Sequence, residues 1–257
     1  MIGSNPALNE ETFSIPVSEL DDNRKVMTMQ GTAFRALTLV GVCVVAASIT
    51  WGMAFKHGFG AAMPWAIGGG IAAFIIALIT CFKPQFSPVT ALLYAITKGL
   101  SLGAISAFYE SSFGSPNGQA TIYQGIVFQA VSLTFGVLAV MLALYATRII
   151  RVTDKLRTAV LAAVGAIFLA YIANFVMGFF GTSMPYIHDS GPIGIGISLV
   201  IIGVAAFMLL IDFDLIERGV QTGAPKYMEW YGGFALLVTL AWLYLEILRL
   251  LAKLRSR

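Results

Sequence analysis

The sequence predicts an all-α, polytopic membrane protein in which seven transmembrane helices form a bundle. Three observations predict this. Hydrophobic residues make up 58% of the 257 residues and charged residues only 11%, whereas soluble domains carry about a quarter charged residues. The mean hydropathy is +0.84. The apolar residues also gather into runs of the length that crosses a bilayer, about 20 residues. This composition argues against a cytosolic enzyme or a nucleic-acid binder, because such a protein needs more polar surface.

Seven apolar stretches are each long enough to cross as a helix. Short separators with turn-forming glycine, proline and asparagine residues lie between them. In chain order the predicted spans are Leu37–Phe55, Ala61–Phe82, Ser87–Phe108, Ile122–Thr147, Thr158–Phe180, Ile193–Ile211 and Tyr231–Leu251.

The first 35 residues are polar and contain neither an apolar core nor a small-residue cleavage site, so they do not resemble a signal peptide. We expect residues 1–35 to form a cytosolic arm and residues 36–257 to form one membrane domain.

The basic residues predict the orientation. Lys and Arg concentrate before the first span and after the second, fourth and sixth, so the positive-inside rule places the N-terminus in the cytoplasm. The C-terminal tail conflicts with this prediction, because it would place Arg249, Lys253, Arg255 and Arg257 outside after seven crossings. Either the tail is an exception or the last segment is re-entrant.

Four ionisable residues fall at membrane depth, where a charge costs about 2.5 to 3.5 kcal/mol and is a functional candidate by default. They are Lys98, Asp212, Asp214 and Glu246. Asp212 lies close to the cytoplasmic boundary and is either buried or interfacial. The alternative for this helix end is a solvated surface on which Asp214, Glu217 and Arg218 form local ion pairs. Asp212 and Asp214 are two residues apart, which turns a helical side chain by about 200°, so both cannot face the bundle interior. Lys98 could pair with one of these aspartates or extend toward the interface. Glu246 and Arg249 are three residues apart and could form a local ion pair.

Other polar residues within the spans are expected mainly to hydrogen-bond between helices. Asn174 is the first candidate among them for lining a water-filled path, because an unpaired amide is costly in hydrocarbon. The stretch from Gly99 to Gly103 matches the G-x-S-x-G pattern of hydrolases. That motif needs a strand-to-helix elbow and a partner histidine, and neither His57 nor His188 lies in a span. We therefore expect no enzyme, and small-residue helix packing at this stretch.

Two regions resemble the Bax inhibitor-1-like (transmembrane Bax inhibitor motif) membrane proteins. The end of the sixth span resembles the family's aromatic-Asp step, and the last span ends in a similar Leu-Arg-Leu-Leu. The N-terminal region resembles an uncharacterised bacterial branch. The residues concerned are Phe213, Asp214 and Leu215; Leu236–Leu251; and Ser4, Asn5, Pro6 and Met27–Gly31.

The resemblance implies a seven-helix bundle with a central last helix. It also implies a calcium leak that pH regulates through two facing aspartates near the cytoplasmic side. Asp214 matches the first aspartate and Asp212 is an additional acid. Thr239 stands at the position of the second aspartate, so a proton shared between two facing carboxylates is not available here. Glu246 lies two turns beyond Thr239 on nearly the same face, about 10 Å further along.

We therefore expect a bacterial inner-membrane protein that passes cations, with the Asp212 and Asp214 region as its main charged site. Calcium is then a transported ion rather than a cofactor, and no cofactor or resident metal is expected. The bilayer is the expected partner, with no nucleic acid. The alternative is a non-conducting regulator that binds another membrane protein, such as a membrane protease.

Overall fold

The computed structural model describes residues 26–114, 125–179 and 191–256, without the side chains of residues 175 and 179. Within them, seven helices are long and apolar enough to cross a bilayer, which confirms the predicted seven-helix bundle. The helices are α1 (Met29–His57), α2 (Phe59–Phe82), α3 (Ser87–Phe113), α4 (Ile126–Ala146), α5 (Asp154–Phe179), α6 (Pro192–Gln221) and α7 (Met228–Arg255), with a short 3₁₀ turn, η3 (Pro84–Phe86), before α3.

The first helix begins within the segment that we assigned to the polar arm. Thr28 has an extended backbone, and its hydroxyl accepts a 3.0 Å hydrogen bond from the amide of Gly31. This N-cap satisfies an amide of the first turn and starts the helix at Met29, upstream of the apolar run. Residues 1–25 of the arm lie outside the described residues.

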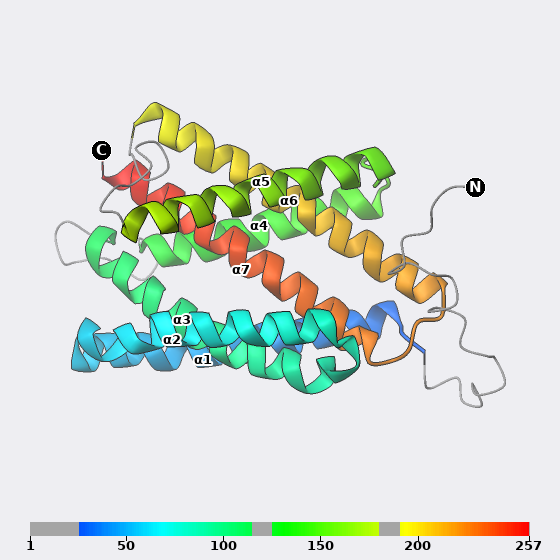
Figure 1. Cartoon of the computed structure of the whole chain (residues 1–257), viewed down its shortest axis with the longest axis horizontal. Helices are drawn as coiled ribbons and strands as arrows, with labels where there is room; N and C mark the ends of the chain where they lie inside the picture. The colour runs from blue at the N-terminus through cyan, green and yellow to red at the C-terminus, as the bar shows by residue number, and fades with distance from the viewer. Residues whose placement is uncertain (1–25, 115–124, 180–190, 257) are drawn as a thin grey trace.

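The helices form two groups with α7 between them. In Figure 1, α1, α2 and α3 lie together on one side, α4, α5 and α6 lie on the other, and α7 crosses diagonally between the groups. Helix α7 packs against α1, α3, α4 and α6, and Leu243 and Leu248 on it are fully buried. The last helix is therefore central, as the resemblance implied.

Helix α7 is continuous over 28 residues, which corresponds to a length of about 42 Å. It runs from the α6–α7 turn to the C-terminal end of the bundle (Figure 1). A re-entrant segment would have to break and turn back, and α7 does neither.

One end of the bundle is closed by contacts between the start of α1 and the α6–α7 turn. The amide of Met27 donates a 2.7 Å hydrogen bond to the carbonyl of Ala224, and the Met27 side chain is buried. Its sulfur lies 3.1 Å from the position that a Cβ on Gly219 would occupy, and its methyl group lies 3.5 Å from that of Gly232. These glycines make room for Met27 and join the N-terminal segment to α6 and α7.

Candidate functional site

The two aspartates of α6 face different surroundings. Asp212 is only 3% exposed, and its Oδ2 accepts a 2.6 Å hydrogen bond from the Thr239 hydroxyl of α7. Asp214, two residues on, points away from this contact, as helical geometry requires. The resemblance matched Asp214 to the family's first aspartate, but the structure brings Asp212 to Thr239 instead.

Asp214 lies among arginines. Its Oδ2 is 2.8 Å from Nε of Arg218 and 3.8 Å from a guanidinium nitrogen of Arg157, with its side chain 14% exposed. Neither contact has hydrogen-bond alignment. A cavity of about 410 Å³ beside it is lined by further arginines, Arg148 and Arg151. These positive charges oppose the approach of a cation to Asp214.

The end of α6 continues as a network of polar side chains. Glu217 accepts hydrogen bonds from the Tyr145 hydroxyl and the Arg148 guanidinium, and one of 3.2 Å from the amide of Gln221. Arg148 is largely exposed. This network lies at the C-terminal end of α6, and an exposed pair such as Arg148–Glu217 contributes little to stability.

Glu246 forms a closed triad with an arginine and a tyrosine. Its Oε1 accepts a 2.6 Å hydrogen bond from the Tyr171 hydroxyl of α5 and a 3.0 Å hydrogen bond from Arg249. The same Arg249 nitrogen donates to the Tyr171 oxygen at 2.7 Å. Glu246 is 2% exposed, so the triad neutralises a carboxylate that has almost no access to solvent.

Lys253 lies one heptad beyond Glu246 and is also buried. Its ammonium donates 3.0 Å hydrogen bonds to the carbonyl of Gly194 and the hydroxyl of Ser198, both on α6. Thr239, Glu246 and Lys253 therefore recur every seven residues, about 10 Å apart, on nearly the same side of α7. We call these three residues the α7 polar face. Sequence reasoning assigned Lys253 to the tail, although its spacing from Glu246 indicated this face.

Lys98 lies apart from these contacts. Lys98 is half-buried on α3, and within the described residues no ion pair joins it to Asp212 or Asp214. The physical reason is that α3 packs on α1, α2 and α7, whereas the aspartates belong to α6. Asn174 is half-buried on α5, one turn beyond Tyr171.

Glu229 is a buried acid that sequence reasoning missed. One of its carboxylate oxygens accepts hydrogen bonds from the amide of Thr28 at 3.2 Å and from its hydroxyl at 2.9 Å. The carboxylate lies against the first turn of α1, where the helix dipole favours negative charge. In the sequence only the N-cap residue Thr28 pointed to this contact, because the fold is what brings Glu229 of α7 to the start of α1.

The G-x-S-x-G stretch serves helix packing. A Cβ on Gly99 would lie 2.3 Å from the carbonyl oxygen of Cys43, and one on Gly103 would lie 2.0 Å from that of Ala47. Ser101 donates a 2.8 Å hydrogen bond to the carbonyl of Ala66 on α2. These contacts fit the small-residue interpretation, in which glycines let α3 approach α1 closely. Of the two histidines, His57 is exposed at the end of α1, and His188 lies outside the described residues.

Comparison with known proteins identifies the family to which this helix arrangement belongs. No curated protein and no solved structure matches the chain. The family model described as Bax inhibitor 1 like matches residues 5–256, nearly the whole chain. The match takes in all seven helices, including the α6 and α7 segments that carry Asp212 and the α7 polar face. The chain therefore belongs to the Bax inhibitor 1 like family of membrane proteins.

Proposed function

We propose that this protein is a non-enzymatic cation leak, with Asp212 as the carboxylate of its pathway and calcium among the ions that it passes. The proposal places it in the bacterial plasma membrane with a cytoplasmic N-terminus. It needs no cofactor, and the bilayer is its required partner.

The observation that carries the proposal is the environment of Asp212. It is buried, it accepts a hydrogen bond from Thr239, and within the described residues it has no ion pair with an arginine or lysine. Asp214, Glu217 and Glu246 each have an arginine within ion-pair distance. A buried acid in a membrane span without a cationic partner is by default a candidate for an ion or proton pathway.

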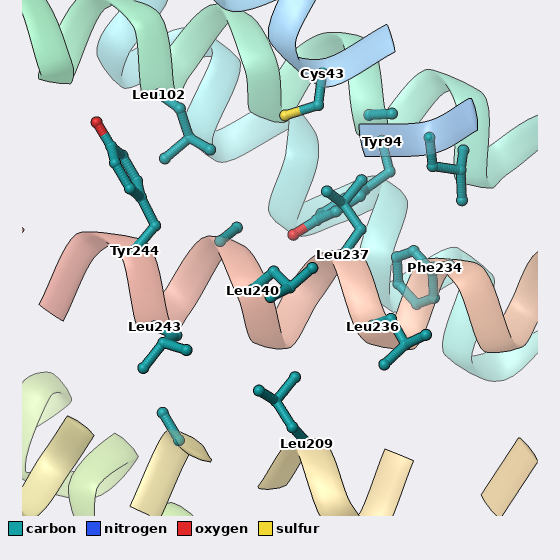
Figure 2. Packing of buried hydrophobic residues seen from close by; sticks show 14 of the residues in the cluster. Cys43, Tyr94, Leu102, Leu209, Phe234, Leu236, Leu237, Leu240, Leu243 and Tyr244 are labelled. Carbon is teal, nitrogen blue, oxygen red and sulfur yellow. The ribbon is translucent and has the colours of Figure 1, made fainter. Parts of the chain in front are cut away.

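The α7 polar face supports a route along the α6–α7 contact. It offers an oxygen ligand beside Asp212, at Thr239, and a carboxylate two turns further along, at Glu246. The ammonium of Lys253, near the start of α6, ends this stretch. Between Thr239 and Glu246 the packing is apolar: the fully buried Leu243 lies on the side of α7 that faces Leu209 of α6 (Figure 2). Cation channels combine acidic side chains that attract ions with hydrophobic constrictions that gate them.

The environment of the basic residues supports the proposed orientation. Arg151 and Lys155 at the α4–α5 turn are exposed, as expected of cytoplasmic charges. The tail cations that conflicted with the rule are held by protein groups where the structure describes them, and Arg257 lies outside the described residues. Arg255 donates hydrogen bonds of 2.8 and 2.6 Å to the carbonyls of Phe113 and Gly114 at the end of α3, and Arg249 is held by Glu246.

The test is calcium flux into proteoliposomes of the purified full-length protein, between about pH 5 and pH 8. We expect flux above that of empty liposomes, a loss of flux in Asp212→Asn, and little change in the matched control Asp214→Asn. Thr239→Asp rebuilds a pair of facing carboxylates, and we expect it to change the pH dependence of the flux. The Asp212→Asn variant must keep the elution volume and helix content of the wild type.

Two results would contradict the proposal. If folded wild-type protein shows no flux at any pH, the chain does not conduct, and the non-conducting regulator of another membrane protein becomes the function to test. If Asp214→Asn abolishes flux and Asp212→Asn does not, the pathway runs past the arginine-rich end of α6 instead.

A further inference from the structure

An apolar groove opens on the side of the bundle, and neither Asp212 nor Thr239 lines it. It has a volume of about 340 Å³ and lies between α1 and α4, with α3 and α7 as its floor. Leu102 of α3 and Tyr244 of α7 face one another across part of this floor (Figure 2). The volume is within the range of ligand pockets, about 300–1,000 Å³.

The groove has the length of one bilayer leaflet. Along α1 its lining extends from Val40 to Trp51, which is about 16 Å at 1.5 Å per residue. Half of a hydrocarbon core of about 30 Å is about 15 Å. Because α1 runs through the membrane, the groove runs in the direction of the lipid chains. On α3 and α4 its lining lies in the half of the bundle where α1 ends and α4 begins, and on α1 and α7 it extends to the middle of each helix.

The hydroxyl groups of the lining are already hydrogen-bonded within the protein. The hydroxyls of Ser48 and Thr134 each donate a 2.7 Å hydrogen bond to a carbonyl of their own helix. Ser106 donates to the carbonyl of Leu102 at 2.6 Å, and the Tyr244 hydroxyl pairs with Ser106 at 2.6 Å. An occupant would therefore be recognised mainly by shape and apolar contact.

We propose that this groove binds one acyl chain of a membrane lipid from the leaflet in which α1 ends. The location within the span, the leaflet-matched length and the satisfied hydroxyls all point to a hydrocarbon chain. The groove differs from the convex lipid-facing surface because its floor is formed by side chains of the core, Leu240 and Tyr244 among them. The proposal does not depend on cation conduction.

Trp51 provides a direct probe, because its ring lines the groove. The purified full-length protein in detergent micelles is titrated with a phosphatidylcholine brominated in the middle of its acyl chains, and tryptophan fluorescence is recorded. We expect a saturable quenching component at about one lipid per chain. This component should be lost in Trp51→Phe.

Groove-filling variants make the assignment specific. Ala47→Phe adds a ring from the α1 wall, and Val131→Phe fills the groove from α4 if the first variant does not fold. Each should remove the saturable component. The matched control, Ala162→Phe, adds the same ring on the exposed surface of α5 and should leave it unchanged.

Two results would overturn the proposal. In the first, quenching rises without saturation and equally in the filled variants and the control. Lipid would then contact Trp51 only non-specifically, as it contacts the rest of the apolar surface. A dimer in micelles that the filled variants dissociate, without saturable quenching, would assign the groove to a second copy of the chain.

Discussion

Replacing Arg249 by methionine should strongly destabilise the bundle, because it removes the charge that neutralises Glu246. The carboxylate is 2% exposed and the guanidinium 28% exposed. Breaking a buried ion pair by removing one partner costs about 3–5 kcal/mol. Since the arginine is partly exposed, we expect the lower end, a loss of about 3 kcal/mol in the free energy of unfolding.

Removing both charges should cost less than removing one. In the double variant Glu246→Gln/Arg249→Met, no charge is left buried, and the amide oxygen can still accept from the Tyr171 hydroxyl. The loss should then be about 1 kcal/mol, the value of an ordinary hydrogen bond. The control Arg151→Met lies at an exposed turn and should stay within about 0.5 kcal/mol of wild type.

The assay is unfolding by sodium dodecyl sulfate in mixed micelles, followed by circular dichroism and tryptophan fluorescence. The single variant should also lower the Tm by roughly 6–12 °C, taking about 2–4 °C per kcal/mol for a protein of this size. If the single variant is no less stable than the double variant, the reasoning about an uncompensated buried charge is wrong.

Two further predictions concern helix contacts. Gly103→Ala places a methyl group 2.0 Å from a carbonyl oxygen of α1, so it should lower the free energy of unfolding by about 1–3 kcal/mol in the same assay. In the control Gly136→Ala the added methyl group meets nothing within 4 Å. The control should be neutral or raise the free energy of unfolding by up to about 1 kcal/mol. Equal effects would exclude close packing of α1 and α3 as the cause. Thr28→Val removes the N-cap of α1 and a hydrogen-bond donor to Glu229. It should lower the free energy of unfolding by about 1 kcal/mol and speed amide hydrogen exchange in the first turn of α1. Thr38→Val, which removes only an exposed bond within α1, should leave that exchange unchanged.

The membrane class, the seven spans and the family followed from the order of residues along the chain. An apolar run long enough to cross a bilayer leaves its backbone few alternatives to a helix, because unpaired amides and carbonyls are too costly in hydrocarbon. This constraint is local, so a single sequence reveals it. The Glu246–Arg249 pair was predictable for the same reason, since three residues along a helix bring both side chains to one face.

The partners of the deep ionisable residues depended on tertiary structure. The helical period implies that the side chains of Asp212 and Asp214 point in different directions. Only the packing of α6 on α7 shows that Asp212 is the one that contacts Thr239. Lys253 and Glu229 likewise gained their partners from helices distant in sequence. In an almost uniformly apolar chain, hydrophobicity does not indicate which face of a helix is inside, because lipid and core are equally apolar. Close packing and buried hydrogen bonds make that choice, and both exist only once the helices have met.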